Sequence, residues 1–363
     1  MSQQNPPKPQ SRAAVIGVVV FYLVAALSVS ARLSPDLCTP DARFQMVMAN
    51  KWVLISTSTP LFFLFTQLAI AALLFLVSDG MRLLPDRLHF DLKVCKGLVA
   101  MVGLNVIGLS FSNYTLKYVD ASFYQVARGL VLPFTVVTSC VVLHSRPSLS
   151  VLGACALVTL GFFIGVFLDG TPVSPKGIFF GVTSSAITAM HSVVIKQSLS
   201  VVNGSALLLS WYTNLLSAVA LAPIMILAGE GPDIMRLLFG VEELIEGRAS
   251  ALGTFLWGSA ITGVLGFAMS IASLLSIKVT SPITHMVSSA VRGVAASLLG
   301  VWLFHDIITT GRATSIGVIL GGSILYTWVK HNESQQQASQ HAYERVKMED
   351  VEAGAHGESK RPE

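Results

Sequence analysis

Charged side chains are scarce in this chain of 363 residues: only 12% are Asp, Glu, Lys or Arg, against about 25% in a typical soluble domain. The four cysteines, at positions 38, 95, 140 and 155, form no CxxC pair, which indicates inert packing residues. The sequence has no run of basic residues of the kind that binds nucleic acid. The apolar segments hold no carboxylate pair, metal-ligand cluster or Ser/His/Asp set. We therefore expect no nucleic-acid partner, no enzymatic activity, no metal and no cofactor.

What the chain has instead is long apolar runs, and 53% of its residues are hydrophobic. About 20 apolar residues suffice for a helix to cross the ~30 Å hydrocarbon core of a bilayer. The sequence thus predicts an all-α polytopic membrane protein with ten transmembrane helices, and the lipid bilayer as its environment. They are expected at residues 13–31, 61–77, 97–111, 121–143, 149–168, 177–195, 206–228, 252–277, 282–304 and 315–329.

The two ends of the chain are polar and lack helical periodicity. We predict disordered cytosolic tails at residues 1–12 and 331–363, around a transmembrane transporter domain at 13–330. The first apolar run shows no convincing small-residue cleavage site, so it is expected to serve as the targeting signal. The loops on the side of the termini carry the larger share of Lys and Arg, which places both termini in the cytosol.

Ten helices divide into two repeats of five, and an odd number inverts the second repeat relative to the first. Such inverted repeats are typical of transporters that bind substrate near the middle of the membrane. The fourth and ninth predicted helices each carry an Arg-Gly pair at a similar place, at Arg128 and Arg292. On the fourth helix, Tyr124 and Gln125 lie on the same stripe as Arg128.

Arg292 lies ten residues beyond Pro282, about 15 Å along its helix. An arginine at that depth costs about 2.5–3.5 kcal/mol on insertion scales, and it nearly always faces a cavity or a partner. Thr284, His285 and Ser288 share its stripe. We interpret Arg292 as an anion-binding residue. The alternative is an arginine held by backbone carbonyls or reaching to the membrane interface.

The seventh predicted helix carries a polar face of Ser210, Asn214 and Ser217, spaced i, i+4 and i+7. This face lines a binding site or makes hydrogen bonds between helices, and the sequence leaves both interpretations open. Two GxxxG spacings, at residues 161–165 and 317–321, are interpreted as close helix packing only.

Several motifs resemble one transporter family. Ser281-Pro-Ile-Thr-His285, followed by Arg292, resembles the ninth-helix signature SP-[LI]-TH…K of the nucleotide-sugar and triose-phosphate translocators, within the drug/metabolite transporter superfamily. The stretch from Asn113 to Arg128 is similar to the junction between the third and fourth helices of GDP-fucose transporters. The closing residues 321–329 are similar to theirs as well.

The resemblance implies a Golgi or endoplasmic reticulum antiporter that imports a nucleotide sugar in exchange for a nucleoside monophosphate, with a homodimer as an open option. With this substrate we expect both arginines to bind the diphosphate and Thr284, His285 and Ser288 to line the phosphate or sugar end. Tyr124 and Gln125, which share the stripe of Arg128, are expected at the site as well. Tyr212 and Asn214 match the Phe-Tyr-Asn-Asn motif that binds guanine in GDP-sugar transporters. Thr213 departs from that motif, and Arg292 replaces a lysine found in many relatives.

The sequence leaves open the identity of the substrate and the origin of residues 29–45. The substrate could be another nucleotide sugar, such as a UDP-sugar or GDP-mannose, or a triose-phosphate-type phosphate ester. In the family the first helix runs unbroken into an Asn-Lys pair, here Asn50-Lys51, whereas residues 29–45 interrupt it in this chain. We interpret this interruption as a retained intron or gene-model artefact, with a real loop outside the membrane as the alternative.

Overall fold

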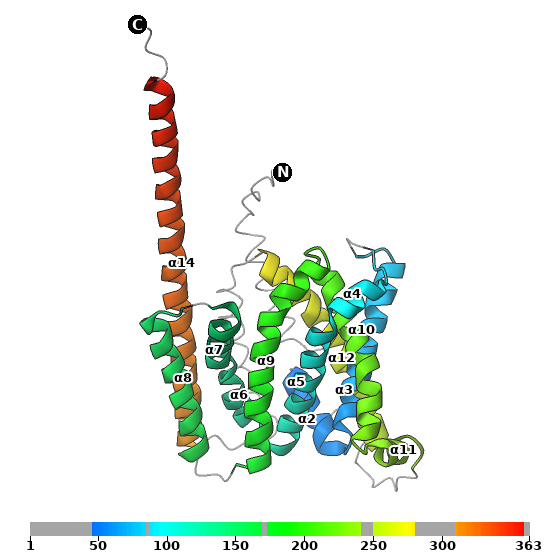
Figure 1. The fold of residues 1–363 in the computed structure, drawn as a ribbon. Coiled ribbons are helices and arrows are strands. Elements are labelled where there is room, and N and C mark those ends of the chain that lie inside the picture. Colours follow the sequence, from blue (N-terminus) through cyan, green and yellow to red (C-terminus); the bar gives the residue numbers. More distant parts are fainter. Residues whose placement is uncertain are drawn as a thin grey trace, which may run out of the picture.

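The computed structural model describes residues 46–84, 87–144, 146–168, 173–240, 250–279 and 309–358. Within these ranges every regular element is a helix (Figure 1). The helices are α2 (Met46–Ser56), α3 (Pro60–Gly80), α4 (Leu92–Gly97), α5 (Val99–Tyr118), α6 (Ala121–Gly129), α7 (Val131–Leu143), α8 (Leu149–Phe167), α9 (Pro175–Val201), α10 (Ala206–Leu227), α11 (Gly231–Phe239), α12 (Ala251–Val279) and α14 (Thr310–Glu358).

Seven spans in the described ranges are long and apolar enough to cross a membrane: Pro60–Gly80, Val99–Tyr118, Ala121–Val142, Leu149–Phe167, Pro175–Val201, Ala206–Leu227 and Ala251–Ser270. Large apolar side chains also cover the outside of the bundle, among them Val141, Phe163 and Leu227. In water such a surface would be costly, but it suits contact with lipid. The prediction of an all-α polytopic membrane protein is confirmed. The predicted helices at 13–31 and 282–304 and the interruption at 29–45 lie outside the described residues.

The predicted fourth helix, at residues 121–143, is one membrane span, Ala121–Val142, with one correction: its hydrogen bonding is irregular at Leu130. The span divides at Leu130 into α6 and α7, where the amide of Leu130 bonds to the carbonyl of Ala127 in a tighter turn (3.2 Å). Pro133, in the first turn of α7, has no N–H to give to the carbonyl of Gly129. The span therefore lacks one of its regular helical hydrogen bonds here, and α6, its first part, has nine residues, although Leu130 keeps helical backbone angles.

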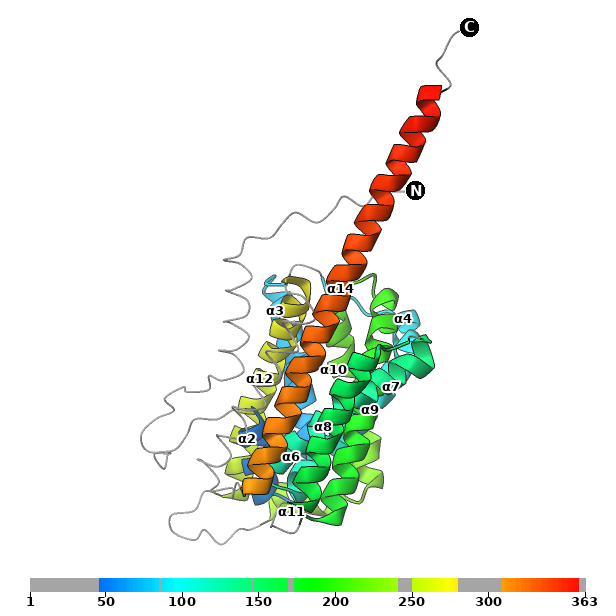
Figure 2. The same ribbon diagram turned by 90° about the vertical axis from the view of Figure 1, so that its left-hand side faces the viewer.

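A second correction concerns the C-terminal tail, because α14 continues to Glu358 where disorder is predicted. In Figures 1 and 2 this helix runs far beyond the end of the bundle. Residues 331–353 contain no Gly or Pro and are rich in Gln, Ala and Glu, which favour helix. Because the helix is already formed inside the bundle, its extension does not incur the cost of nucleation. Lys330 and Glu333 add an ion pair one turn apart (3.0 Å).

Helix α6 lies in a packed interior shared by several helices. Its residues Phe123 and Val126 are buried together with Phe162 of α8 and Ile319 of α14. Helix α8 runs alongside α14, and α5 alongside α9. Gly161 of α8 allows the close approach, since a Cβ there would meet the side chain of Ile319 at 2.7 Å.

The GxxxG predictions hold for one pair of glycines and fail for the other. A Cβ on Gly165 would lie 2.6 Å from Oγ of Ser315, so the 161–165 pair does face a neighbouring helix. Gly317 and Gly321 have open space where their Cβ atoms would be. The packing glycine in that part of α14 is Gly322, whose Cβ would meet Val158 at 2.6 Å.

Candidate functional site

Arg128 lies in the last turn of α6 and is held by a neighbour on the same helix. Its guanidinium donates a hydrogen bond to the Tyr124 hydroxyl (3.2 Å) and lies 5.7 Å from the centroid of the tyrosine ring. The Tyr124 hydroxyl in turn lies 2.6 Å from Oγ of Ser112 on α5. A guanidinium can only donate, so the tyrosine oxygen accepts from Arg128, while either hydroxyl can be the donor in the bond between Tyr124 and Ser112.

The burial of these residues differs in a way that suits anion binding. Tyr124 is buried, with 6% of its surface exposed, and Ser112 is half-buried, whereas Arg128 is exposed on the surface of α6. Gln125, next to Tyr124, is half-buried. An arginine offers a planar fork of donors that matches a phosphate group. A guanidinium that a neighbouring tyrosine orients in this way has the chemistry to bind such an anion.

The second predicted half of the site cannot be placed in the same way. Thr284, His285, Ser288 and Arg292 lie outside the described residues, so their arrangement stays a prediction.

The structure places Tyr212 in a different environment from Arg128. Its side chain is fully buried in a hydrophobic cluster with Leu98 and Leu221. Tyr124 belongs to a different cluster, the one that contains Phe123 of α6. The Tyr212 hydroxyl donates to the carbonyl of His89 (2.7 Å) and accepts from the amide of Asp91 (2.8 Å). These bonds tie α10 to the segment that leads into α4, and Asp91 caps α4 by accepting from the amide of Lys93 (2.8 Å).

The polar face of α10 is used in part for contacts between helices. Ser217 is buried and accepts a hydrogen bond from the side-chain amide of Asn105 on α5 (2.9 Å), as the packing interpretation predicts. Asn214 is half-buried, and its amide nitrogen donates to the carbonyl of Ser210 in its own helix (2.8 Å). Of the two predicted base-binding residues, Asn214 is thus the more accessible.

Sequence reasoning missed a polar cluster between α2, α3 and α12. The buried Gln67 donates to Asn50 (2.7 Å) and to Thr262 (2.7 Å), and nearby Thr66 donates to Ser259 (3.1 Å). A polar group inside a membrane helix needs such partners. The one available signal was Gln67 itself, an amide within an apolar run, but a single helix does not reveal its neighbours.

A bundle of apolar spans with an oriented arginine on one of them defines a polytopic helical membrane protein with a candidate anion site. The sequence comparisons narrow this class. The chain belongs to the Triose-phosphate Transporter family, which matches residues 42–327. The predicted family is thereby confirmed.

Three relatives show how far the similarity extends. GDP-fucose transporter 1 of Mus musculus is 31% identical over 328 residues, which cover 87% of this chain and 86% of that protein. The GDP-fucose transporter, Golgi, of Drosophila melanogaster is 31% identical over 307 residues, or 81% and 88% of the two chains. The GDP-fucose transporter of Caenorhabditis elegans is 29% identical over 363 residues, or 96% and 92%.

One solved structure supports the fold alone. A protein crystal structure matches with a TM-score of 0.51 at 14% sequence identity, covering 89% of this chain and 99% of the other.

Proposed function

We propose that this protein is an antiporter that carries a nucleotide sugar, with GDP-fucose as the favoured type, into the Golgi lumen in exchange for a nucleoside monophosphate. The observation that carries the proposal is the oriented guanidinium of Arg128 in a chain whose relatives include GDP-fucose transporters matched over most of their length. A diphosphate is the part of such a substrate that an arginine fork recognises best.

In this proposal Arg128 and Arg292 bind the diphosphate from two inverted five-helix repeats. Charge-assisted hydrogen bonds in a site shielded from water offset the cost of desolvating both the cations and the phosphates. The site carries more positive charge when empty than when loaded, which disfavours closing around an empty site. Return without a bound nucleotide is therefore slow, and this favours strict exchange.

The remaining predicted residues take the other parts of the substrate. Asn214 binds the base through its side-chain amide, while Tyr212, whose hydroxyl is bound to His89 and Asp91, shapes that end of α10. Gln125 and the predicted stripe of Thr284, His285 and Ser288 line the phosphate and sugar end.

Localisation and orientation complete the proposal. The Drosophila relative is named for the Golgi, which supports that membrane over the endoplasmic reticulum. In Figure 1, α4 and the far end of α14 lie at one end of the bundle and α11 at the other. The end with α4 carries Lys93 and Lys96, so the positive-inside rule favours the cytosol for this end and for the far end of α14, and we propose a cytosolic N-terminus as well. A C-terminal tag protected from protease in sealed Golgi vesicles would contradict this orientation.

A second candidate is a phosphate-ester translocator, which the name of the matched family favours. It would use the same arginines for a smaller substrate. Asn214 on α10 argues against it, because a phosphate ester has no base for this amide to bind.

Exchange in proteoliposomes tests the proposal. Vesicles loaded with GMP should take up labelled GDP-fucose, and vesicles without internal nucleotide should take up little. UDP-sugars, GDP-mannose and triose phosphate, offered as competitors, identify the substrate. Uptake that is the same in loaded and empty vesicles would rule out exchange, and competition by triose phosphate alone would select the second candidate.

A further inference from the structure

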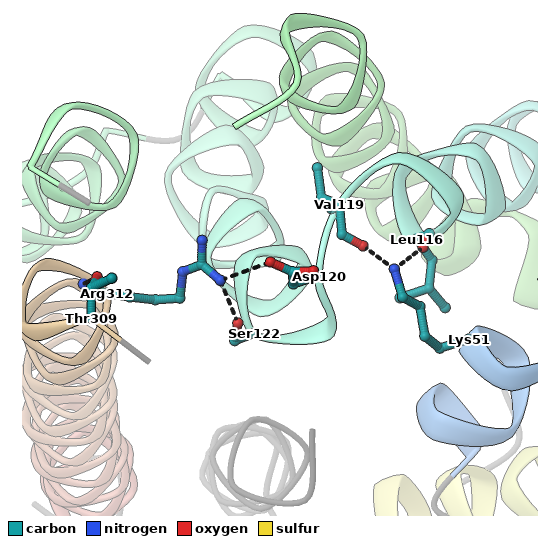
Figure 3. Close-up of polar contacts among 7 residues, drawn as sticks. All are labelled: Lys51, Leu116, Val119, Asp120, Ser122, Thr309 and Arg312. Carbon is teal, nitrogen blue, oxygen red and sulfur yellow. Dashed lines mark hydrogen bonds and ion pairs between the residues drawn. The ribbon is translucent and has the colours of Figure 1, made fainter. Parts of the chain in front are cut away.

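Two buried cations hold the corner between α5 and α6 from opposite sides (Figure 3). Helix α5 ends at Tyr118 and α6 begins at Ala121, so only Val119 and Asp120 connect them. The cations are Lys51 of α2 and Arg312 of α14, with 7% and 2% of their surfaces exposed. A charge in such a place needs a specific partner.

Lys51 binds the end of α5. Its ammonium donates to the carbonyl oxygens of Leu116 (3.0 Å) and Val119. Carbonyls at the C-terminal end of a helix lack partners within the helix, and the helix dipole favours a cation there. Lys51 thereby fixes where α5 ends.

Arg312 binds the beginning of α6. Its guanidinium donates to the carboxylate of Asp120 (3.2 Å) and to the buried hydroxyl of Ser122 (2.9 Å), and it lies 6.0 Å from the centroid of the Phe123 ring. Asp120 is the residue before the first turn, yet its carboxylate makes no bond to the amides of α6. The carboxylate binds Arg312 instead, and so it joins α6 to α14.

This contact lies on the same helix as Arg128. Arg128 is eight residues from Asp120, about 12 Å along the helix at ~1.5 Å per residue. A tighter turn at Leu130 interrupts the hydrogen bonds between α6 and α7, although the two helices form one membrane span, Ala121–Val142. The position of α6 depends on packing and on its anchored N-terminal end.

We propose that Arg312, together with Asp120 and with Lys51 on the other side of the corner, is a positioning residue for the anion site. It sets the place of α6 and so the place of the Arg128 guanidinium, without touching substrate. The functional part of this inference rests on the proposed role of Arg128 in binding the diphosphate. Arg312 lies between the predicted helices at 282–304 and 315–329, where the sequence pattern indicates no role for it.

Exchange kinetics of reconstituted Arg312→Ala protein test the functional consequence. A misplacement of about 1 Å can cost up to about 100-fold. We expect the KM for the nucleotide sugar to rise about tenfold, equivalent to about 1.4 kcal/mol, with kcat per molecule within about twofold. Arg312→Lys keeps the charge and should restore part of the affinity.

A matched control lies one turn away on α14. Ser315 donates to the carbonyl of Gly161 on α8 (2.7 Å). It therefore links α14 to α8 and takes no part in the ion pair between Arg312 and Asp120. Ser315→Ala should leave KM unchanged. If Arg312→Ala folds poorly, Asp120→Asn keeps the volume and removes the ion pair, and it should raise KM in the same direction. If Arg312→Ala or Asp120→Asn folds and has the KM of the wild type, the inference is overturned.

A second measurement does not depend on transport. The four native cysteines are replaced by serine, and a cysteine is placed at Gln125 on α6. Its alkylation rate should differ between the chain that keeps Arg312 and the Arg312→Ala chain, and the Ser315→Ala chain should match the chain that keeps Arg312. Equal rates in all three would overturn the positioning role. A wild-type protein that exchanges no nucleotide, with alkylation still sensitive to Arg312, would overturn the proposed function and leave the positioning role intact.

Discussion

Arg128 and Tyr124 interact twice within one turn of α6: the guanidinium donates to the tyrosine hydroxyl at 3.2 Å and lies 5.7 Å from the centre of its ring. Both contacts limit how the guanidinium can turn. The hydroxyl is also 2.6 Å from Ser112, which anchors the pair to α5. A charged side chain with a fixed orientation loses less conformational entropy when it binds an anion.

Removing either arginine of the proposed site should abolish exchange. In the proposed complex the diphosphate and the closed site cover both guanidinium groups, and truncation of one member of such a buried charged contact costs about 2–5 kcal/mol, or roughly 30- to 5,000-fold in binding. Arg128→Ala and Arg292→Ala should therefore reduce exchange per reconstituted molecule to background, while both proteins still insert in the membrane. Arg292→Lys should retain a measurable fraction, because the charge remains.

Two outcomes separate this prediction from a packing role. A packing arginine, once removed, would lower expression or thermal stability and leave exchange per molecule near normal. Tyr124→Phe provides a graded comparison, since it removes the bond from Arg128 and keeps the ring. A hydrogen bond to a charged group is worth about 1.5–3 kcal/mol, so this variant should weaken exchange less than Arg128→Ala.

Asn214→Ala should raise the KM for the nucleotide sugar without unfolding the protein. A lost hydrogen bond to a neutral group costs roughly 0.5–1.5 kcal/mol, or up to about tenfold in affinity. Competition by GMP and UMP, measured on wild type and variant, shows whether the amide distinguishes the bases. Equal competition by both nucleotides, unchanged in the variant, would remove α10 from the site.

The sequence predicted the membrane helices well because the length of an apolar run directly sets the length of a span. Helix α8 was expected at residues 149–168 and occupies Leu149–Phe167. Helix α10 was expected at 206–228 and occupies Ala206–Leu227. The irregular turn at Leu130 was missed because both sides of it are apolar enough to read as one run. The helical tail was missed because it is polar, although its composition favours helix.

The length of an apolar run does not predict which helices contact each other. Helical periodicity shows which side chains share a face, as for Tyr124 and Arg128, but not what lies opposite. The partners of Arg312 are 190 and 192 residues away along the chain. The bond from the Tyr212 hydroxyl to the carbonyl of His89 was not predictable either, because His89 lies in a segment of no regular pattern.

The glycines of α8 and α14 allow a test of packing with an internal control. A Cβ on Gly161 would lie 2.7 Å from the side chain of Ile319 and 3.2 Å from the carbonyl oxygen of Ser315. We expect Gly161→Ala to lower stability by about 1–3 kcal/mol, because the two helices must move apart. Gly321 has open space, so Gly321→Ala should be neutral or stabilising by up to about 1 kcal/mol. Thermal unfolding in detergent measures both, and equal effects would contradict this packing.

Glu230 supports the beginning of α3 from a distant part of the chain. It follows α10, is buried, and its carboxylate accepts from the amides of Leu61 (3.0 and 3.1 Å) and Phe62 (2.9 Å). Those amides have no partners within α3. Burial raises the pKa of Glu230 above its ordinary value of 4.5, although the two amides and the nearby Lys117 partly oppose the shift.

The sign of this shift predicts how stability changes with pH. A carboxyl group whose pKa is raised by folding binds its proton more tightly in the folded state, so its stabilising contribution is complete below about pH 4.5 and is lost as the pH rises through the raised value. Glu230→Gln keeps an oxygen acceptor and cannot ionise. The melting temperature of wild type should therefore fall relative to Glu230→Gln as the pH rises, and the two should be closest at low pH.

Two further variants separate titration from capping. Glu230→Ala leaves the amides of Leu61 and Phe62 without their acceptor and should cost about 0.5–2 kcal/mol at every pH. Asp233→Asn removes a more exposed carboxylate nearby, which pairs with Arg236 at 3.7 Å, and it controls for the loss of one negative charge. If wild type instead gained stability over Glu230→Gln with rising pH, the ionised carboxylate would be the favoured form. The amides and Lys117 would then outweigh the effect of burial.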